Sequence, residues 1–315
     1  MKFDELRALL MVVLACLLEE PALGADCPTF LLKWEPTVPL GGSFYGVAGL
    51  TIDPQGLVVV VDGTLCRVQR FSQTGEFVSG FGSCGHDSTQ LQGPTDAAVN
   101  SRGEVYVADY QGLALKKFAA DGTFLRQWIL PGCDYLAVDH DDNVYVTAYW
   151  NVVKYDGNGN QVREWGGYGS GDGQFGSGFA YGIGIGPSGR IYVADHGNQR
   201  IEVFAPDGTF SQAWSTAGPG IVPGYPRGVA VDALEGVYVA TDFGVYRFTA
   251  GGELVCKWEL RGDGDGAFLD PWDVTVARDG SLYVTDVTRR DVQKFGALNV
   301  PVRATTWGLM KVRYR

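Results

Sequence analysis

One pattern of apolar and polar positions occurs six times along the chain. Its centre is an alternating run that follows a turn and ends in an acidic or small residue, as in GEVYVAD at 103–109. Two copies are close, at 189–195 and 280–286, and three are weaker, at 56–62, 142–148 and 235–241. Their central residues lie 47, 39, 47, 46 and 45 positions apart: Val59, Tyr106, Tyr145, Tyr192, Tyr238 and Tyr283. Such a period indicates a solenoid, a propeller or an array of small units.

Each repeat predicts four strands. An apolar run such as VAV at 229–231 opens the repeat and is short enough for a strand buried on both faces. The strand with the central tyrosine follows, and a third strand ends in an aromatic residue. A glycine turn such as DG at 121–122 leads into a fourth strand, which ends in Phe81 or in a tryptophan. Hairpin-linked strands in sets of four, repeated about every 45 residues, indicate propeller blades.

The sixth repeat shows no fourth strand after Phe295. Residues 29–34 (TFLLKW) match 123–128 (TFLRQW), which form the fourth strand of the second repeat. Because a closed ring removes unpaired sheet edges, the N-terminal segment is expected to complete the last blade. The sequence therefore predicts an all-β chain: one domain over 29–297, a six-bladed β-propeller of four-stranded antiparallel blades, closed by an N-terminal strand.

Composition agrees with this fold and limits the function. Glycine accounts for 45 of the 315 residues, with no collagen period, which suits many tight turns. Aromatic residues make up 12% of the chain and favour strands. The formal charge is −11 and the pI is about 4.7. Since contact with phosphates depends mostly on Lys and Arg, this acidic balance argues against a nucleic-acid partner.

The first 24 residues predict export. The apolar run 8–18 has 11 residues, fewer than the roughly 20 that a spanning helix needs. Basic residues precede it, and the small residues Ala22 and Gly24 fit cleavage after Gly24, so 1–24 is expected to be a signal peptide. The mature chain would be secreted, periplasmic or on the cell surface, without a transmembrane helix; a lipid anchor at Cys16 is the alternative.

Cysteine usage fits the same prediction. Five cysteines remain after cleavage: Cys27, Cys66, Cys84, Cys133 and Cys256. In an oxidising compartment one or two disulfides are expected, with at least one thiol left over. No Cys-x-x-Cys pair and no Cys/His cluster with zinc spacing occurs, so the cysteines are not expected to bind metal.

Two segments resemble NHL repeats: PRGVAVD at 226–232 and YVADHGNQRIEVF at 192–204. The resemblance covers nearly all of the mature chain and implies a six-bladed NHL propeller. The chain departs from the Asn-x-Arg-Ile signature, whose arginine is present at Arg67 and Arg200 only. The other repeats have a different residue at that position: Ala114, Asn151, Gly244 and Asp291. Family functions that depend on those loops therefore do not carry over.

In such a ring, the connections that lead into the inner strands share one rim. They contribute the binding candidates Tyr45, Asp96, Asp134, Tyr181, Arg227, Trp272 and Asp273. Asp96 and Asp273 stand out because the family usually has glycine there. Carboxylates that face a channel can hold calcium or act as acid and base, but capping a turn or accepting neighbouring amides is the favoured interpretation. The aspartates found once per blade are expected to fix the same turn in each: Asp62, Asp109, Asp195 and Asp286.

The resemblance also brings two enzyme classes into consideration. Amidating lyases have a zinc site with three histidines plus Tyr and Arg. This chain offers Tyr181 and Arg227, but its histidines are not expected to meet, because His140 lies at the opposite end from His86 and His196. Lactonase-type propellers hold a channel metal with Glu, Asn and Asp. The aspartates predicted near the channel, Asp96, Asp134 and Asp273, keep this second enzyme class as a hypothesis. No residue is assigned as catalytic and no cofactor is predicted, with calcium or zinc in the channel as the alternative.

The predicted function is an exported, non-catalytic binding or scaffold module, expected to be a monomer, which presents its rim to a protein, peptide or glycan. The alternative is a metal-dependent propeller enzyme, lactonase-, hydrolase- or lyase-like, that uses the channel carboxylates. Residues 298–315 form a basic and aromatic C-terminal tail with four basic residues and no acidic one. The tail is expected either to pack on the rim or to dock on a membrane face, an export machine or a partner.

Overall fold

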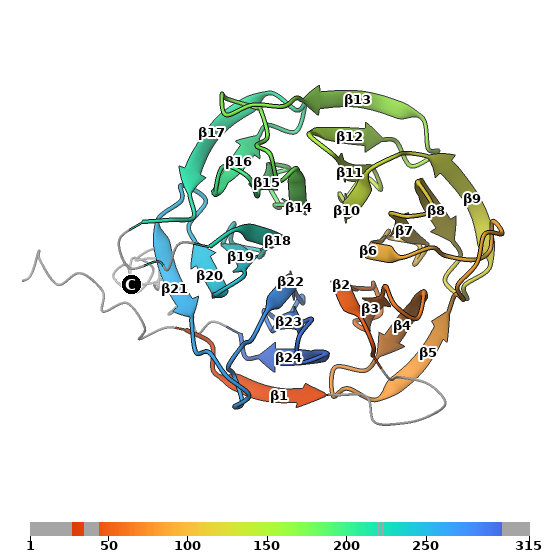
Figure 1. The fold of residues 1–315 in the computed structure, drawn as a ribbon, viewed down its shortest axis with the longest axis horizontal. Helices are drawn as coiled ribbons and strands as arrows, with labels where there is room; N and C mark the ends of the chain where they lie inside the picture. Colours follow the sequence, from red (N-terminus) through yellow and green to blue (C-terminus); the bar gives the residue numbers. More distant parts are fainter. Residues whose placement is uncertain (1–26, 35–43, 219–220, 222–223, 298–315) are drawn as a thin grey trace, which may run out of the picture.

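The computed structural model describes residues 27–34, 44–218, 221 and 224–297. Within them the chain forms six four-stranded antiparallel sheets arranged radially around a central axis (Figure 1). The fold class predicted from the repeat is therefore confirmed. The predicted signal peptide and the C-terminal tail lie outside the described residues. In the part of the chain that the structure describes, no helix is long and apolar enough to cross a membrane.

Each blade is a meander whose first strand lies nearest the axis. Blades 1 to 3 comprise β2 (Val47–Ile52), β3 (Val58–Asp62), β4 (Arg67–Phe71), β5 (Phe77–Phe81); β6 (Pro94–Val99), β7 (Val105–Asp109), β8 (Ala114–Phe118), β9 (Phe124–Ile129); β10 (Cys133–Val138), β11 (Val144–Ala148), β12 (Asn151–Tyr155), β13 (Gln161–Gly166). Blades 4 to 6 comprise β14 (Ala180–Ile185), β15 (Ile191–Asp195), β16 (Arg200–Phe204), β17 (Phe210–Ser215); β18 (Pro226–Val231), β19 (Val237–Thr241), β20 (Gly244–Phe248), β21 (Leu254–Trp258); β22 (Pro271–Val276), β23 (Leu282–Asp286), β24 (Asp291–Phe295) and β1 (Phe30–Trp34).

The ring is closed by its N-terminal strand, as predicted. Strand β1 pairs antiparallel with β24, so that Phe30 lies opposite Phe295 (Figure 1). The segment before β1 is also attached to blade 5, because Cys27 forms a disulfide with Cys256 of β21. The indole Nε1 of Trp258 donates a hydrogen bond to the Pro28 carbonyl at 2.9 Å. The first strand therefore ties the last two blades together.

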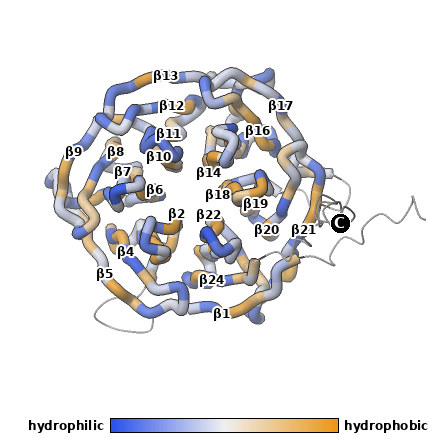
Figure 2. The backbone as a smooth tube through the Cα atoms, turned by 180° about the vertical axis from the view of Figure 1, so that it is seen from behind, coloured by the Kyte–Doolittle hydropathy of each residue, from blue (hydrophilic) through white to orange (hydrophobic). Residues whose placement is uncertain are grey.

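Burial explains why the second strand of each blade has the clearest sequence signal. All five residues of these strands, such as β3 and β15, are buried. Apolar side chains from adjacent blades form shared clusters, as where Val59 and Val61 of blade 1 pack with Val107 of blade 2. Figure 2, the view from behind, shows apolar positions on strands around the whole ring. Blade-to-blade burial is thus the main source of stability in this fold.

Two of the recurring aspartates, Asp62 and Asp286, have the expected structural role. Asp62 accepts hydrogen bonds from four backbone amides, two of them in the connection before β2 and two in the turn after β3. Asp286 does the same in blade 6. Each carboxylate therefore fixes both loops on its side of the blade.

The two arginines that hold the inter-blade loops occupy different sequence positions. In blade 4, Arg200 donates to the carbonyls of Ser170, Gly171 and Gln174. In blade 6 the corresponding position is Asp291, but Arg289, two residues earlier, takes over: it donates to the carbonyls of Gly262, Gly264 and Ala267 and pairs with Asp291. The departure from the signature arginine at Asp291 therefore preserves the loop contacts.

The described part of the chain contains two disulfides, within the range expected from the sequence. Besides Cys27–Cys256, Cys66 is bonded to Cys84, which ties the turn after β3 to the loop between blades 1 and 2. Cys133 has a free thiol and is buried.

Candidate functional site

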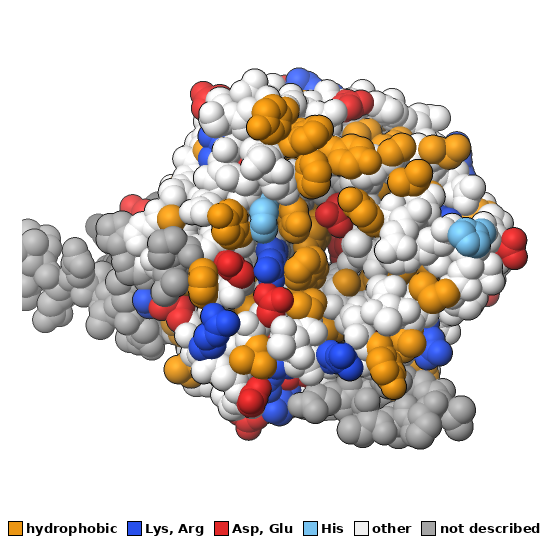
Figure 3. All heavy atoms as spheres, in the orientation of Figure 1, with side chains coloured by type: hydrophobic (Ala, Val, Ile, Leu, Met, Phe, Trp, Pro, Cys, Tyr) orange, Lys and Arg blue, Asp and Glu red, His pale blue; other side chains and the backbone are white. Residues whose placement is uncertain are grey.

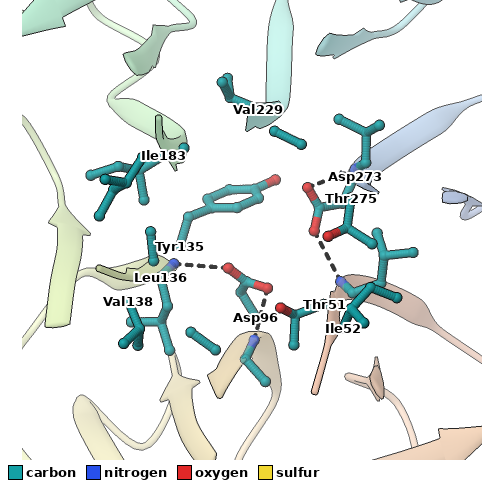
Figure 4. Close-up of a pocket in the computed structure, with 18 of the residues that line it drawn as sticks. Thr51, Ile52, Asp96, Tyr135, Leu136, Val138, Ile183, Val229, Asp273 and Thr275 are labelled. Carbon is teal, nitrogen blue, oxygen red and sulfur yellow. Dashed lines mark hydrogen bonds between the residues drawn. The ribbon is translucent and has the colours of Figure 1, made fainter. Parts of the chain in front are cut away.

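The inner strands of all six blades surround a central cavity of about 280 Å³. Its wall is mainly aliphatic, with Leu136, Ile183 and Val229 among the lining residues. Besides Thr51 and Thr275, the polar exceptions come from the third residue of the inner strands. In chain order, the third-position residues are Gly49, Asp96, Tyr135, Gly182, Gly228 and Asp273. Three of the six thus carry polar side chains, and these face one another in the channel (Figure 4).

Asp96 and Asp273 make the same set of hydrogen bonds. One carboxylate oxygen of Asp96 accepts the amide of Ala97, and the other accepts the amide of Leu136 in the next blade. Asp273 accepts the amides of Val274 and of Leu50, again in the next blade. These bonds support the interpretation that the two aspartates satisfy neighbouring amides and join blade 2 to blade 3 and blade 6 to blade 1.

Both carboxyl groups carry an electrostatic cost. Burial raises the pKa of Asp273 to about 7. Burial, with the nearby Asp273 as the next cause, raises the pKa of Asp96 well above its usual range. The backbone amides oppose these shifts because they favour the ionised form. Burial in the channel therefore favours the protonated form of these carboxyl groups, and a positive partner would be needed to hold them both ionised.

Tyr135 was not among the candidates from the sequence. It is 2% exposed, and its hydroxyl oxygen is buried without a hydrogen-bond partner. Figure 4 shows its phenol ring extending from β10 towards Asp273. The sequence could have indicated Tyr135 by its position, because it is the third residue of its inner strand, as Asp96 and Asp273 are of theirs. In blade 3 the adjacent Asp134 was predicted instead.

The glycines at the third position leave room for the carboxylates. A Cβ atom added at Gly228 would lie 2.2 Å from Oδ1 and 2.6 Å from Cα of Asp273. Because a backbone atom is involved, rotation of the side chain cannot relieve the collision. We expect Gly228→Ala to lower the free energy of unfolding by about 1–2 kcal/mol, measured by urea denaturation. Gly264, which has open space around its Cβ position, provides the control; equal losses in both alanine variants would contradict the steric explanation.

The second residues of four consecutive inner strands contribute the remaining candidates near the channel mouth: Asp134, Tyr181, Arg227 and Trp272. The Arg227 guanidinium lies 4.7 Å from the centre of the Trp272 ring and pairs with Asp270. Burial raises the pKa of Asp134 to about 6. Figure 3 looks down the channel and shows apolar, acidic and basic side chains around the central hollow.

His196 joins this group through stacking that the sequence did not reveal. Its ring lies between two tyrosines, with centroids 4.3 Å from Tyr181 and 4.9 Å from Tyr225. Nδ1 is 3.1 Å from the Pro226 carbonyl oxygen, which requires a proton on Nδ1 in the neutral ring and leaves Nε2 as the acceptor. Burial lowers the pKa of His196, so the neutral form is favoured. We call Tyr181, His196, Tyr225, Arg227 and Trp272 the mouth cluster.

The other candidates lie apart from this cluster. Tyr45 is two residues before β2 and 58% exposed, with the Arg290 guanidinium 5.8 Å from its ring centre. His140 lines a different opening, next to Asp53 and Asp139. Within the described ranges, no three His, Cys, Asp or Glu side chains gather as a metal site would require.

The comparisons agree with the architecture. The NHL-repeat family model matches residues 180–204, which span β14 to β16 of blade 4. Protein brain tumor of Drosophila melanogaster is 27% identical over 132 residues, which are 40% of this chain and only 13% of that protein.

Solved structures of three enzymes share the fold. A gluconolactonase from Xanthomonas campestris superposes with a TM-score of 0.62 at 17% identity, covering 87% of this chain and 98% of that one. A streptogramin B lyase superposes with a TM-score of 0.60 at 15% identity, covering 85% of this chain and 97% of that one. The third structure is a catalytically inactive histidine-to-alanine variant of virginiamycin B lyase from Staphylococcus aureus, with quinupristin. It superposes with a TM-score of 0.59 at 11% identity, covering 86% of this chain and 89% of that one. At these identities the likeness concerns the fold alone.

The fold and the channel define a six-bladed β-propeller. Its fourth blade carries the NHL repeat, and the prediction of an NHL-repeat propeller is confirmed.

Proposed function

We propose that the protein is an exported binding module whose propeller presents the channel mouth to a protein, peptide or glycan. The observation that carries this proposal is the mouth cluster, in which a stacked Tyr–His–Tyr group lies beside an arginine stacked on a tryptophan. Tyr, Trp and Arg are the side chains most enriched at binding hot spots. The side chains of the mouth cluster come from blades 4 to 6, and their combination differs from blade to blade, so the cluster is not a feature of the repeat.

The cluster offers both apolar and polar contacts. The aromatic rings provide area for the faces of sugar rings or for apolar peptide side chains. Nε2 of His196 and the guanidinium of Arg227 provide directional hydrogen bonds at fixed positions. A rigid scaffold with variable loops is a common setting for recognition sites.

Export is supported by the predicted signal peptide together with the two disulfides, because disulfides persist in oxidising compartments. The formal charge of −11 supports a partner other than nucleic acid.

The test is binding to a glycan array and to an immobilised peptide library, with the purified chain and three variants. We expect a set of ligands that the wild type and His140→Ala bind equally, since His140 lies at another opening. Arg227→Ala and Trp272→Ala should lose at least tenfold in affinity for this set. Binding that is insensitive to both mouth substitutions, or no binding to either library, would overturn the proposal.

An enzyme is the second candidate, favoured by one observation. Asp134, with its pKa raised to about 6, and the neutral His196 both occur among the residues near the mouth, and groups titrating near neutral pH are suited to acid–base chemistry. A channel calcium site fits poorly, because calcium takes six to eight oxygen ligands and, among the described residues, only two carboxylates, those of Asp96 and Asp273, line the cavity. Turnover of a lactone substrate that is lost in both Asp134→Asn and His196→Ala would favour the enzyme.

A further inference from the structure

We infer that the channel binds a primary ammonium group, held between the carboxylates of Asp96 and Asp273 and the phenol oxygen of Tyr135. The three side chains come from blades 2, 6 and 3 and point into one cavity (Figure 4). The group belongs either to a free alkylamine or to a lysine side chain of a bound peptide. This inference deepens the proposed function and rests on it for the peptide, which would enter past the mouth cluster.

The charge of the site calls for a cation. Asp96 and Asp273 are 4% and 5% exposed, and among the residues that the structure describes no Lys or Arg lines the cavity that they face. Arg227, the basic residue of the mouth cluster, is already paired with Asp270. Without a positive partner, burial favours the protonated forms of these two carboxyl groups, so a bound ammonium group would take the place of a proton as the compensating positive charge.

The hydrogen-bonding capacity fits an ammonium group. Each carboxylate oxygen accepts one backbone amide and keeps a second lone-pair direction free. The Tyr135 hydroxyl has no partner, although it is buried and points into the cavity. An ammonium group has three N–H donors, which matches one acceptor from each of the three side chains.

The walls fit an alkyl stem. Leu136, Ile183 and Val229 line the cavity around the three polar side chains, and the ring of Tyr181 lies 5.5 Å from that of Tyr135. Methylene groups are favoured on such a surface, and aromatic faces attract cations. A short alkyl chain would therefore find apolar contacts at these residues, within a cavity whose accessible surface is mostly polar.

The experiment measures thermal stability and calorimetric binding with n-butylammonium chloride. Matched probes are n-butanol, which lacks the charge, and tetramethylammonium, which lacks N–H donors. Comparing the binding of N-acetyl-lysine methylamide with that of its norleucine analogue, which lacks the ammonium group, tests whether the site accepts a lysine side chain of a peptide. We expect butylammonium to raise the melting temperature and both control probes to leave it unchanged. A lysine response with no butylammonium response would overturn the small-amine site as stated.

Variants assign the response to the three side chains. Tyr135→Phe should weaken butylammonium binding about threefold to tenfold and Asp273→Asn at least tenfold. The control is Tyr283→Phe, because Tyr283 also has a buried hydroxyl without a partner but lies outside the cavity lining. Equal binding by Tyr135→Phe and wild type would overturn the inference.

A calcium or magnesium titration completes the design. Stabilisation by either ion with none by butylammonium would overturn the inference in favour of a metal site, and no response to any cation would overturn it in favour of a water-filled channel. Either result leaves the array experiment at the mouth intact, so the failure of this inference and the failure of the proposed function are distinguishable.

Discussion

Replacing Cys27 and Cys256 together by serine is expected to lower the free energy of unfolding by about 5 kcal/mol. The bond joins residues 229 positions apart, and in the chain-entropy description a cross-link over a long loop restricts the unfolded chain most. The same bond holds the segment before β1 against blade 5, so its loss also weakens ring closure. Urea denaturation of the oxidised wild type and the double variant, at equal ionic strength, measures the difference.

The matched control is the double serine variant at Cys66 and Cys84. That bond spans only 18 positions and lies between a turn and a loop, so the same description gives about 3 kcal/mol. A smaller loss for the long-range bond than for the short one would contradict the role of Cys27–Cys256 in closing the ring.

Replacing Glu202 by glutamine is expected to stabilise the protein at pH 8 by about 2–4 kcal/mol. Burial raises the pKa of Glu202 to about 8, although Arg200 opposes the shift. Its Oε1 accepts the Gly173 amide, whereas Oε2 is buried without a partner. Blade 6 has a glutamine at the corresponding place: Gln293 accepts the Gly266 amide and donates to the Ala267 carbonyl.

The pH dependence provides the decisive readout. Below about pH 4.5 the carboxyl group is protonated in both the folded and the unfolded state, so the two proteins should differ little. As the pH rises towards 8, the unfolded chain loses its proton first, and the wild type is progressively destabilised relative to Glu202→Gln. The reciprocal Gln293→Glu should lose stability over the same pH range. A stability difference that is constant between pH 4.5 and 8 would show that ionisation of Glu202 is not its source.

The blades and the closing strand were predictable because they depend on local patterns. Strands buried on both faces have continuous apolar runs, and residues 29–34 repeat the alternation of a fourth strand closely enough to reveal their place beside β24. Asp96 and Asp273 were recognised as departures from the family glycine, and their amide bonds match the favoured interpretation.

The composition of the site was less accessible because it depends on contacts between blades. His196 and Tyr225 come from different blades, and no spacing within one repeat indicates that their rings stack. Tyr135 was missed by one position, because the candidate chosen in blade 3 was the adjacent Asp134, the second residue of the strand, whereas Asp96 and Asp273 are third residues. Arg289 was missed because the arginine signature was read at a single position, whereas a long side chain can reach the same carbonyls from two residues earlier.

The pairing of Phe30 with Phe295 has a consequence for biosynthesis. The first strand leaves the ribosome long before its neighbour β24 exists, so the propeller cannot close until β24 has been made. Blades with local hairpins can form earlier, but the final step brings together segments from the two ends of the chain and is expected to be slow. A chain that stays open in this way would remain suitable for translocation before folding is complete.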